Sequence, residues 1–98
     1  MNLQAMMKQA QKMQKDMMDA KKQIDETTFE VTKSFVTVSA KGTKKIESIK
    51  IDMDSLDKDE IEMLEDLILV TINELMDKID VEVENKMGKY TQGMPGLF

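Results

Sequence analysis

Four lysines at helical spacing are the residues of this chain best suited to binding chemistry. Lys8, Lys15 and Lys22 recur every seven residues, so a helix would align them on one face, with Lys12 beside that line. The arrangement favours contact with phosphate groups, because lysine is a mobile point charge suited to a nucleic-acid backbone. The alternative is a solvated helix face, since this position of a coiled coil is usually charged.

The helix that would carry these lysines is predicted over residues 1–25, with Asn2 as its N-cap. Its apolar residues are separated by alternating steps of three and four, as in the a/d seam of a coiled coil. They are Leu3, Met6, Ala10, Met13, Met17, Ala20 and Ile24. We expect this seam to pack on another helix, and the off-seam residues Met7 and Met18 to remain available to the C-terminal tail or a partner.

Residues 27–53 change to a period of two, which predicts three strands. In the second strand, for example, Val36, Val38 and Ala40 share one face. The second turn is marked by Gly42, whereas the first, near Lys33–Ser34, has a weaker signal. A three-stranded antiparallel meander is the simplest arrangement.

A second helix is predicted over residues 57–86. Asp57 followed by Glu60 has the spacing of a capping box, and Gly88 is expected to end the helix. The apolar stripe that would be buried consists of Leu64, Ile68, Ile72, Leu75, Ile79 and Val83. Residues 87–98 are expected to form a flexible tail, in which Tyr90 could stack on a ligand or contact phosphate.

The charge of the chain is unevenly distributed. The formal net charge of −5 is not that of a typical nucleic-acid binder, but residues 1–50 carry +4 and residues 51–98 carry −9. Such asymmetry favours an electrostatic partner for the basic half. The turn lysines Lys41, Lys44 and Lys45 are either a second basic cluster or protection for a sheet edge. The acids of the second helix lack the glycine-containing calcium-loop pattern and are expected to be solvated.

The composition excludes several kinds of chemistry. The chain has no cysteine and no histidine, so it lacks thiolates and the commonest general base and metal ligand. We therefore predict no enzyme, no cofactor and no metal site. No apolar run approaches the ~20 residues that cross a membrane, and the N-terminus is too polar for a signal peptide. A single domain over residues 1–98 in a soluble, cytoplasmic protein is the expectation.

The predicted helix lengths indicate projecting arms and a dimer. Thirty helical residues span ~45 Å, whereas a compact chain of about 100 residues has a radius of gyration near 13 Å. The sheet edges and the apolar turn at residues 67–70 need cover, which a second copy would supply. We expect an α+β protomer with two long helices packed antiparallel, which would bring Lys8, Lys12 and Lys15 near Lys86 and Lys89.

Several segments together resemble the YbaB/EbfC family of bacterial nucleoid-associated proteins. The similarity covers essentially the whole chain, with the most specific pieces at residues 63–68 and 87–96, after a Met/Gln/Lys-rich opening at residues 6–14. It implies α-β-β-β-α protomers in a tweezer-like homodimer that binds DNA between or along its arms. The chain departs from the family at Lys33–Ser34–Phe35, where many members have glycines, and it lacks the arginine that would read guanine.

Two functional hypotheses follow. The first is a cytoplasmic, nucleoid-associated protein that binds duplex DNA as a homodimer with loose sequence preference, in nucleoid organisation, gene regulation or recombination and repair. Its expected DNA-binding residues are Lys8, Lys12, Lys15, Lys22, Lys86 and Lys89. The second is a protein-interaction module that grips a replication or recombination protein through methionine-rich arms. The acidic net charge predicts weak, salt-sensitive binding in the first case.

Overall fold

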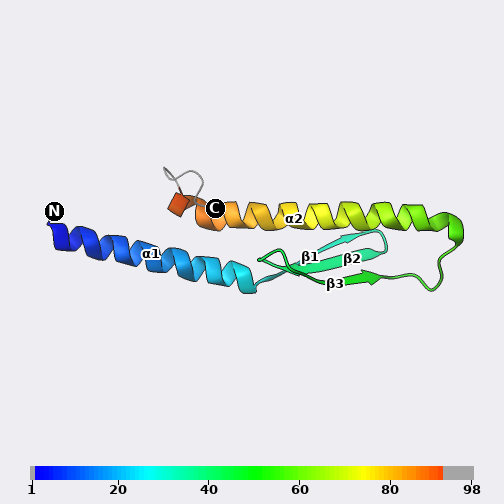
Figure 1. The fold of residues 1–98 in the computed structure, drawn as a ribbon, viewed down its shortest axis with the longest axis horizontal. Coiled ribbons are helices and arrows are strands. Elements are labelled where there is room, and N and C mark those ends of the chain that lie inside the picture. The colour runs from blue at the N-terminus through cyan, green and yellow to red at the C-terminus, as the bar shows by residue number, and fades with distance from the viewer. Residues whose placement is uncertain (1, 92–98) are drawn as a thin grey trace.

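The protein is elongated, with two long helices joined by a small sheet (Figure 1). The computed structural model describes residues 2–91, whose overall extents are 71 × 21 × 15 Å. The radius of gyration is 19.5 Å, against about 13 Å for a compact chain of this size. The element order α-β-β-β-α and the projecting helices are therefore as predicted.

Helix α1 (Leu3–Glu26) is bounded by short polar side chains at both ends. The Asn2 Oδ1 accepts a hydrogen bond from the Ala5 N–H (2.7 Å), which confirms the predicted N-cap. At the other end the Thr27 N–H donates to the Ile24 carbonyl oxygen (3.1 Å), and the Thr27 hydroxyl donates to that of Gln23 (2.6 Å). The chain then passes directly into the sheet, so no linker separates α1 from the first strand.

Strands β1 (Thr28–Lys33), β2 (Val36–Lys41) and β3 (Ile46–Ile51) form the predicted antiparallel meander, in the order β1-β2-β3. Lys33 pairs with Val36, so the first turn has two residues, and Ser34 adopts the left-handed conformation there (φ 55°) without glycine. In the second turn Lys44 has positive φ (72°). The hairpin at Lys33–Ser34–Phe35 thus forms without the family's glycines.

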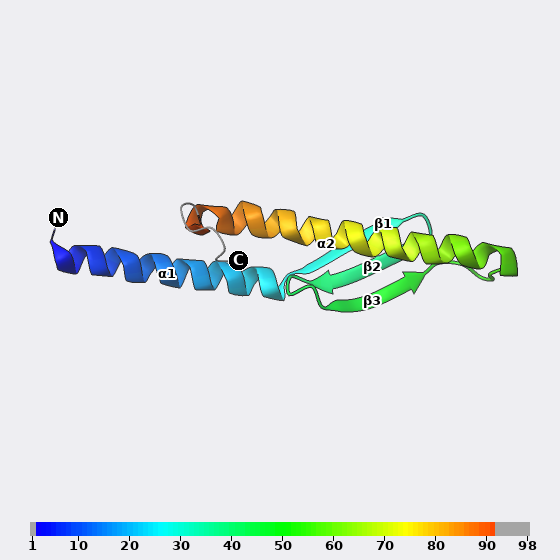
Figure 2. The same ribbon diagram turned by 45° about the horizontal axis from the view of Figure 1, so that its top comes forward.

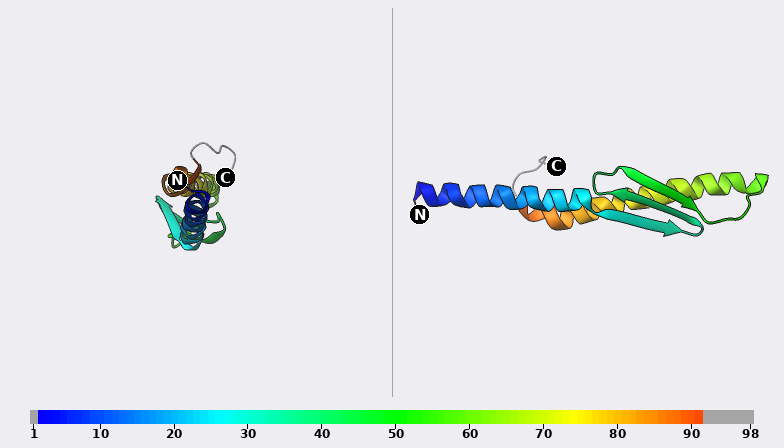
Figure 3. Two further views of the ribbon diagram at one scale, coloured as in Figure 1. Left: turned by 90° about the vertical axis from the view of Figure 1, so that its left-hand side faces the viewer. Right: turned by 90° about the horizontal axis from the view of Figure 1, so that it is seen from below.

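Helix α2 (Ile61–Thr91) follows a short 3₁₀ turn η1 (Lys58–Glu60), and it packs across one face of the sheet (Figure 3). Within the described residues α2 packs on β1 and β2 and makes no comparable contact with β3. The buried core consists of Phe29, Val36, Val38, Ala40, Leu75 and Ile79. Consequently the isoleucines of β3 are left 40–46% exposed.

The capping box predicted before α2 is present, but the predicted helix bounds are wrong at both ends, because residues 58–60 form a 3₁₀ turn and α2 itself begins at Ile61. The Asp57 N–H donates to the Glu60 carboxylate (3.1 Å), as a capping box requires. The helix, however, continues through Gly88 to Thr91, so the boundary predicted at residue 86 is wrong. Glycine costs about 1 kcal/mol in a helix interior, but Met87 is fully buried beside it, and this packing holds the helix together. The rest of the expected tail, residues 92–98, lies outside the described residues.

Candidate nucleic-acid interface

Helix α1 displays the predicted lysine line in full. Lys8, Lys12, Lys15 and Lys22 are all exposed, and within residues 2–91 none of them forms an ion pair. No acid occurs before Asp16, so all charged side chains in the N-terminal half of the helix are positive. At 1.5 Å per residue, Lys8 and Lys22 are ~21 Å apart along the axis, which corresponds to about six base pairs of B-DNA.

The end of α2 brings two of the predicted residues together. Lys12 and Lys89 line the same hollow, along with Gln9 and Tyr90. The Lys89 ammonium lies 5.0 Å from the centre of the Tyr90 ring, within range of a cation–π interaction. Asp16 lines the hollow too, and its carboxylate offsets part of the positive charge. Lys12 and Lys89 are therefore neighbours, as the antiparallel arrangement predicts.

Lys86 does not join this group, contrary to expectation. It lies 3.4 Å from the Glu82 carboxylate and lines a different hollow, with Ile24 and Phe29 at the far end of α1. The physical reason is the offset between the helices, since α1 extends well past the end of α2 (Figure 2). The last turns of α2 therefore lie beside the middle of α1, and Lys86 is placed near the sheet.

The densest group of acids lies far from the N-terminal lysines of α1. Residues 57–66 hold six acids and one lysine, and they lie at the end of the molecule opposite the N-terminus of α1 (Figure 1). This distribution agrees with the predicted one, basic toward the free end of α1 and acidic at the sheet end. The net charge of −5 therefore does not describe the surface that a phosphate would meet on α1.

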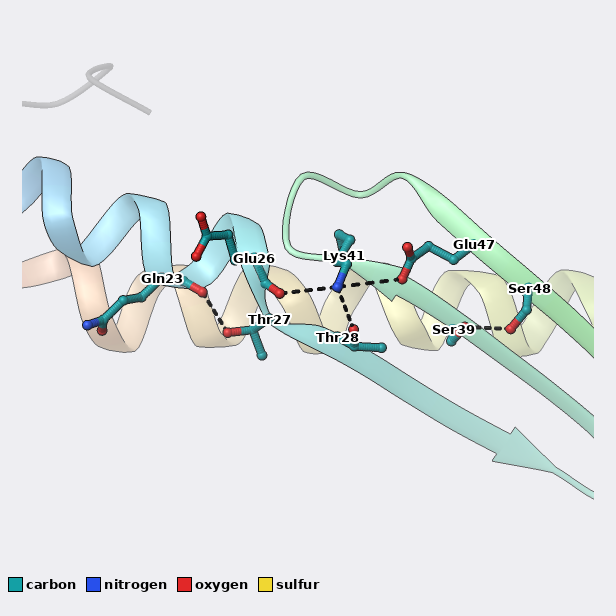
Figure 4. A network of polar contacts seen from close by, with 8 residues as sticks. All are labelled: Gln23, Glu26, Thr27, Thr28, Ser39, Lys41, Glu47 and Ser48. Atoms are coloured by element: carbon teal, nitrogen blue, oxygen red, sulfur yellow. Dashed lines mark hydrogen bonds and ion pairs between the residues drawn. The ribbon is translucent and has the colours of Figure 1, made fainter.

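The turn lysines are largely occupied within the protein rather than free for a ligand. The Lys41 ammonium donates to the Glu26 carbonyl oxygen (3.3 Å) and the Thr28 hydroxyl (3.0 Å), and it lies 4.0 Å from the Glu47 carboxylate (Figure 4). Lys44 forms an ion pair with Asp80 (2.6 Å). Sequence reasoning missed the role of Lys41, which joins the end of α1 to β1 and β3. In the sequence, only the position of Lys41 at the end of a strand, beside Gly42, could have indicated this role.

The described part of the chain also lacks two other kinds of feature. Among residues 2–91, no group of three or more acidic side chains is arranged to hold a metal ion. No helix in that range is long and apolar enough to cross a membrane.

Comparison with known proteins connects this chain to a family. The sequence model of the YbaB/EbfC DNA-binding family matches residues 1–94. A nucleoid-associated protein of Enterococcus faecalis is 41% identical over 98 residues, covering 98% of this chain and 94% of that protein. A nucleoid-associated protein of Oceanobacillus iheyensis is 46% identical over 101 residues, covering 99% and 97%. A third from Clostridium novyi is 44% identical over 102 residues, covering 100% and 90%.

Proposed function

This chain belongs to the YbaB/EbfC DNA-binding family, and we propose that it is a nucleoid-associated protein that binds duplex DNA as a homodimer through the lysines of α1. Lys8, Lys12, Lys15 and Lys22 carry the main contacts, and Lys89 adds one beside Lys12. Lys86, paired with Glu82, takes a smaller part. The protein acts in the nucleoid of the cytoplasm, in nucleoid organisation, gene regulation or recombination and repair.

The observation that carries this proposal is the lysine line of α1, none of whose four members forms an ion pair within residues 2–91, and whose N-terminal part, up to Lys15, has no acid. Lysines without a carboxylate partner are available to phosphates, and each contact releases condensed counterions from the DNA. Lysine contacts the backbone as a point charge, and the chain has no arginine to read guanine through two hydrogen bonds. We therefore infer loose sequence preference and binding that weakens steeply with salt.

The homodimer is supported by an apolar surface that the single chain leaves uncovered. Ile46, Ile49 and Ile51 of β3 are 40–46% exposed, and they pair with the buried residues of β2, so they share the sheet face that α2 covers elsewhere. β3 is also an edge strand, whose outer backbone groups have no ladder partner among the described residues. A second copy would cover both features.

Helix α2 extends this apolar surface. Its Asp80 pairs with Lys44 in the turn between β2 and β3, so the side of α2 that carries Asp80 faces this turn. Leu69 lies eleven residues earlier, close to three full helical turns, and is therefore on the same side. It is 59% exposed. Two such surfaces related by a two-fold axis bury each other and leave the α1 helices projecting as two arms.

The alternative function, a module that grips a replication or recombination protein, is not favoured by the family match. Its sequence basis was the set of methionines on α1. Met6, Met7, Met13 and Met18 are indeed exposed.

The test is a titration of fluorescent duplex DNA with the full chain at several salt concentrations. We expect the triple variant K8A/K12A/K15A to weaken binding to all sequences alike. Each phosphate contact contributes about 0.9 to the slope of log affinity against log salt, so that slope should become clearly shallower. The matched control is K45A/K50A/K58A, which removes the same charge from exposed lysines outside α1. Equal losses in both variants would refute a site on α1.

A further inference from the structure

The last turns of α2 lie beside the middle of α1, and a hollow separates the two helices there. Helix α1 runs on past this point (Figure 2), so Leu3, Met6 and Met13 of its apolar seam are 72%, 53% and 55% exposed. The predicted packing of the whole seam on α2 is thus wrong for its N-terminal half. The residues that line the hollow, which we call the Tyr90 hollow, are Gln9, Lys12, Met13, Asp16, Lys89 and Tyr90.

The residues that α1 contributes to the Tyr90 hollow share one face of the helix. They are spaced at i, i+3, i+4 and i+7, which places them on two successive turns that face the end of α2. The hollow has a volume of about 390 Å³, within the range of sites that hold small organic ligands, and it is open to solvent. Such a site can take one unit of a polymer while the rest of the polymer stays outside.

Tyr90 gives this hollow an aromatic wall. Among residues 2–91 it is the one aromatic residue outside the core, since Phe29 belongs to the core and Phe35 packs against it. Tyr90 is half-buried, and the Lys89 ammonium lies 5.0 Å from the centre of its ring. An aromatic ring beside lysines is the combination that binds single-stranded nucleic acid, because any base can stack on the ring while the lysines attract the phosphates.

The charged and polar groups of the hollow suit a whole nucleotide better than a bare phosphate. Neither Lys12 nor Lys89 forms an ion pair within residues 2–91, so both ammonium groups are available to a phosphate. Asp16 lies one helical turn from Lys12, and its carboxylate repels a phosphate. The Asp16 carboxylate and the Gln9 amide oxygen can instead accept hydrogen bonds from the amino groups of bases.

An intact duplex does not offer such a base. Its bases are stacked on one another inside the double helix, and a base must leave the stack before a protein side chain can stack on it. The free-energy cost of that step is smallest for a base that is mismatched or already single-stranded. Tyr90 therefore finds a stacking partner where DNA contains unpaired bases, whereas the α1 lysines find phosphates on any duplex.

We propose that the Tyr90 hollow binds one unpaired base of DNA, stacked on the Tyr90 ring, with the adjoining phosphate held by Lys12 and Lys89. The protein then binds duplexes that contain unpaired bases more tightly than intact ones. This inference rests on the proposed function, because the α1 lysines bring the DNA to the hollow. It makes a separate prediction, since phosphate contacts carry no information about the bases.

The test compares two fluorescent duplexes of equal length, one fully paired and one with a few adjacent mismatches at its centre. Both have the same number of phosphates, so their electrostatic attraction is matched. We expect the full chain to bind the mismatched duplex about tenfold more tightly, within the range found for stacking of one base on an aromatic side chain. Tyr90→Leu should lose this preference but keep its affinity for the paired duplex. Tyr90→Phe is the matched control, because it keeps an aromatic ring and should keep the preference.

The outcomes separate this proposal from the proposed function. Equal affinity of the unmodified protein for the two duplexes, or a preference that survives Tyr90→Leu, would overturn stacking on Tyr90 and leave duplex binding intact. An equal loss of affinity for both duplexes in Tyr90→Leu would also overturn it, because a purely structural role of Tyr90 gives that result. Failure of the unmodified protein to bind either duplex would refute the proposed function itself.

Tyrosine fluorescence gives a second measurement on the unmodified protein, because Tyr90 is its only tyrosine and it has no tryptophan. A base stacked on the ring should quench this emission. We expect strong quenching at saturation with the mismatched duplex and little with the paired duplex, which is matched in absorbance. Equal quenching by both duplexes, or quenching by neither, would contradict the proposal.

Discussion

A methyl group on Gly42 would lie 1.9 Å from the carbonyl oxygen of Ile24. The Gly42 N–H donates to the Thr27 carbonyl oxygen (3.1 Å), so the β2–β3 turn sits directly against the last turn of α1. With Lys41 bound to the Glu26 carbonyl oxygen, this contact fixes the direction in which α1 leaves the sheet. The lysines of α1 are therefore positioned by a turn that is remote from them.

Gly42→Ala should destabilise the protein strongly. The added carbon would meet backbone atoms of Ile24, which have no free rotation to move aside, so α1 or the turn must shift. We expect the free energy of unfolding to fall by about 2–3 kcal/mol, as for other overpacked sites. Thermal or urea unfolding at a fixed protein concentration measures the change. An unchanged midpoint would mean that the backbone at Ile24 can move away from residue 42 without loss of stability.

Gly88→Ala should instead stabilise the protein. This glycine lies inside α2, and a methyl group there would meet nothing within 4 Å. Replacing glycine by alanine in a helix interior gains about 0.5–1 kcal/mol, so the midpoint should rise. The same unfolding experiment measures it. A loss of stability would indicate that α2 does not run through this position in solution.

Ile49→Asp should separate the proposed dimer. The substitution puts a charge into the apolar surface of β3 that a second copy would cover. We expect monomers by analytical ultracentrifugation at concentrations where the unmodified protein is dimeric. Lys50→Asp is the matched control, because it also introduces an acid into β3 but on the other face of the strand. If Ile49→Asp remained dimeric, the interface would lie elsewhere.

Lys89→Ala should weaken DNA binding more than Lys86→Ala. Lys89 lies beside Lys12, whereas Lys86 is paired with Glu82 near the sheet. Each variant loses one positive charge, so a difference between them reports position rather than net charge. Fluorescence anisotropy with duplex DNA at low salt should show a several-fold loss for Lys89→Ala and a smaller one for Lys86→Ala. The reverse order would move the interface toward the sheet.

The sequence by itself determined the features that depend on neighbouring residues. The helix cap at Asn2, the capping box at Asp57 and the alternation of β2 all involve residues within a few positions of one another, and each was predicted as it is found. The lysine line of α1 is equally local, since a heptad spacing on any helix aligns Lys8, Lys15 and Lys22. The resemblance to the YbaB/EbfC family then indicated duplex DNA as the ligand of these lysines.

Only the tertiary structure decided how far the elements overlap. The offset between the two helices separates Lys86 from Lys12 and leaves Met6 and Met13 of α1 exposed, and the sequence did not predict that α2 continues past Gly88. Periodicity identifies which face of a helix is apolar but carries no information on where its partner starts or stops. That offset is set by distant contacts, among them the fit of Gly42 against Ile24, which no local pattern in the sequence records.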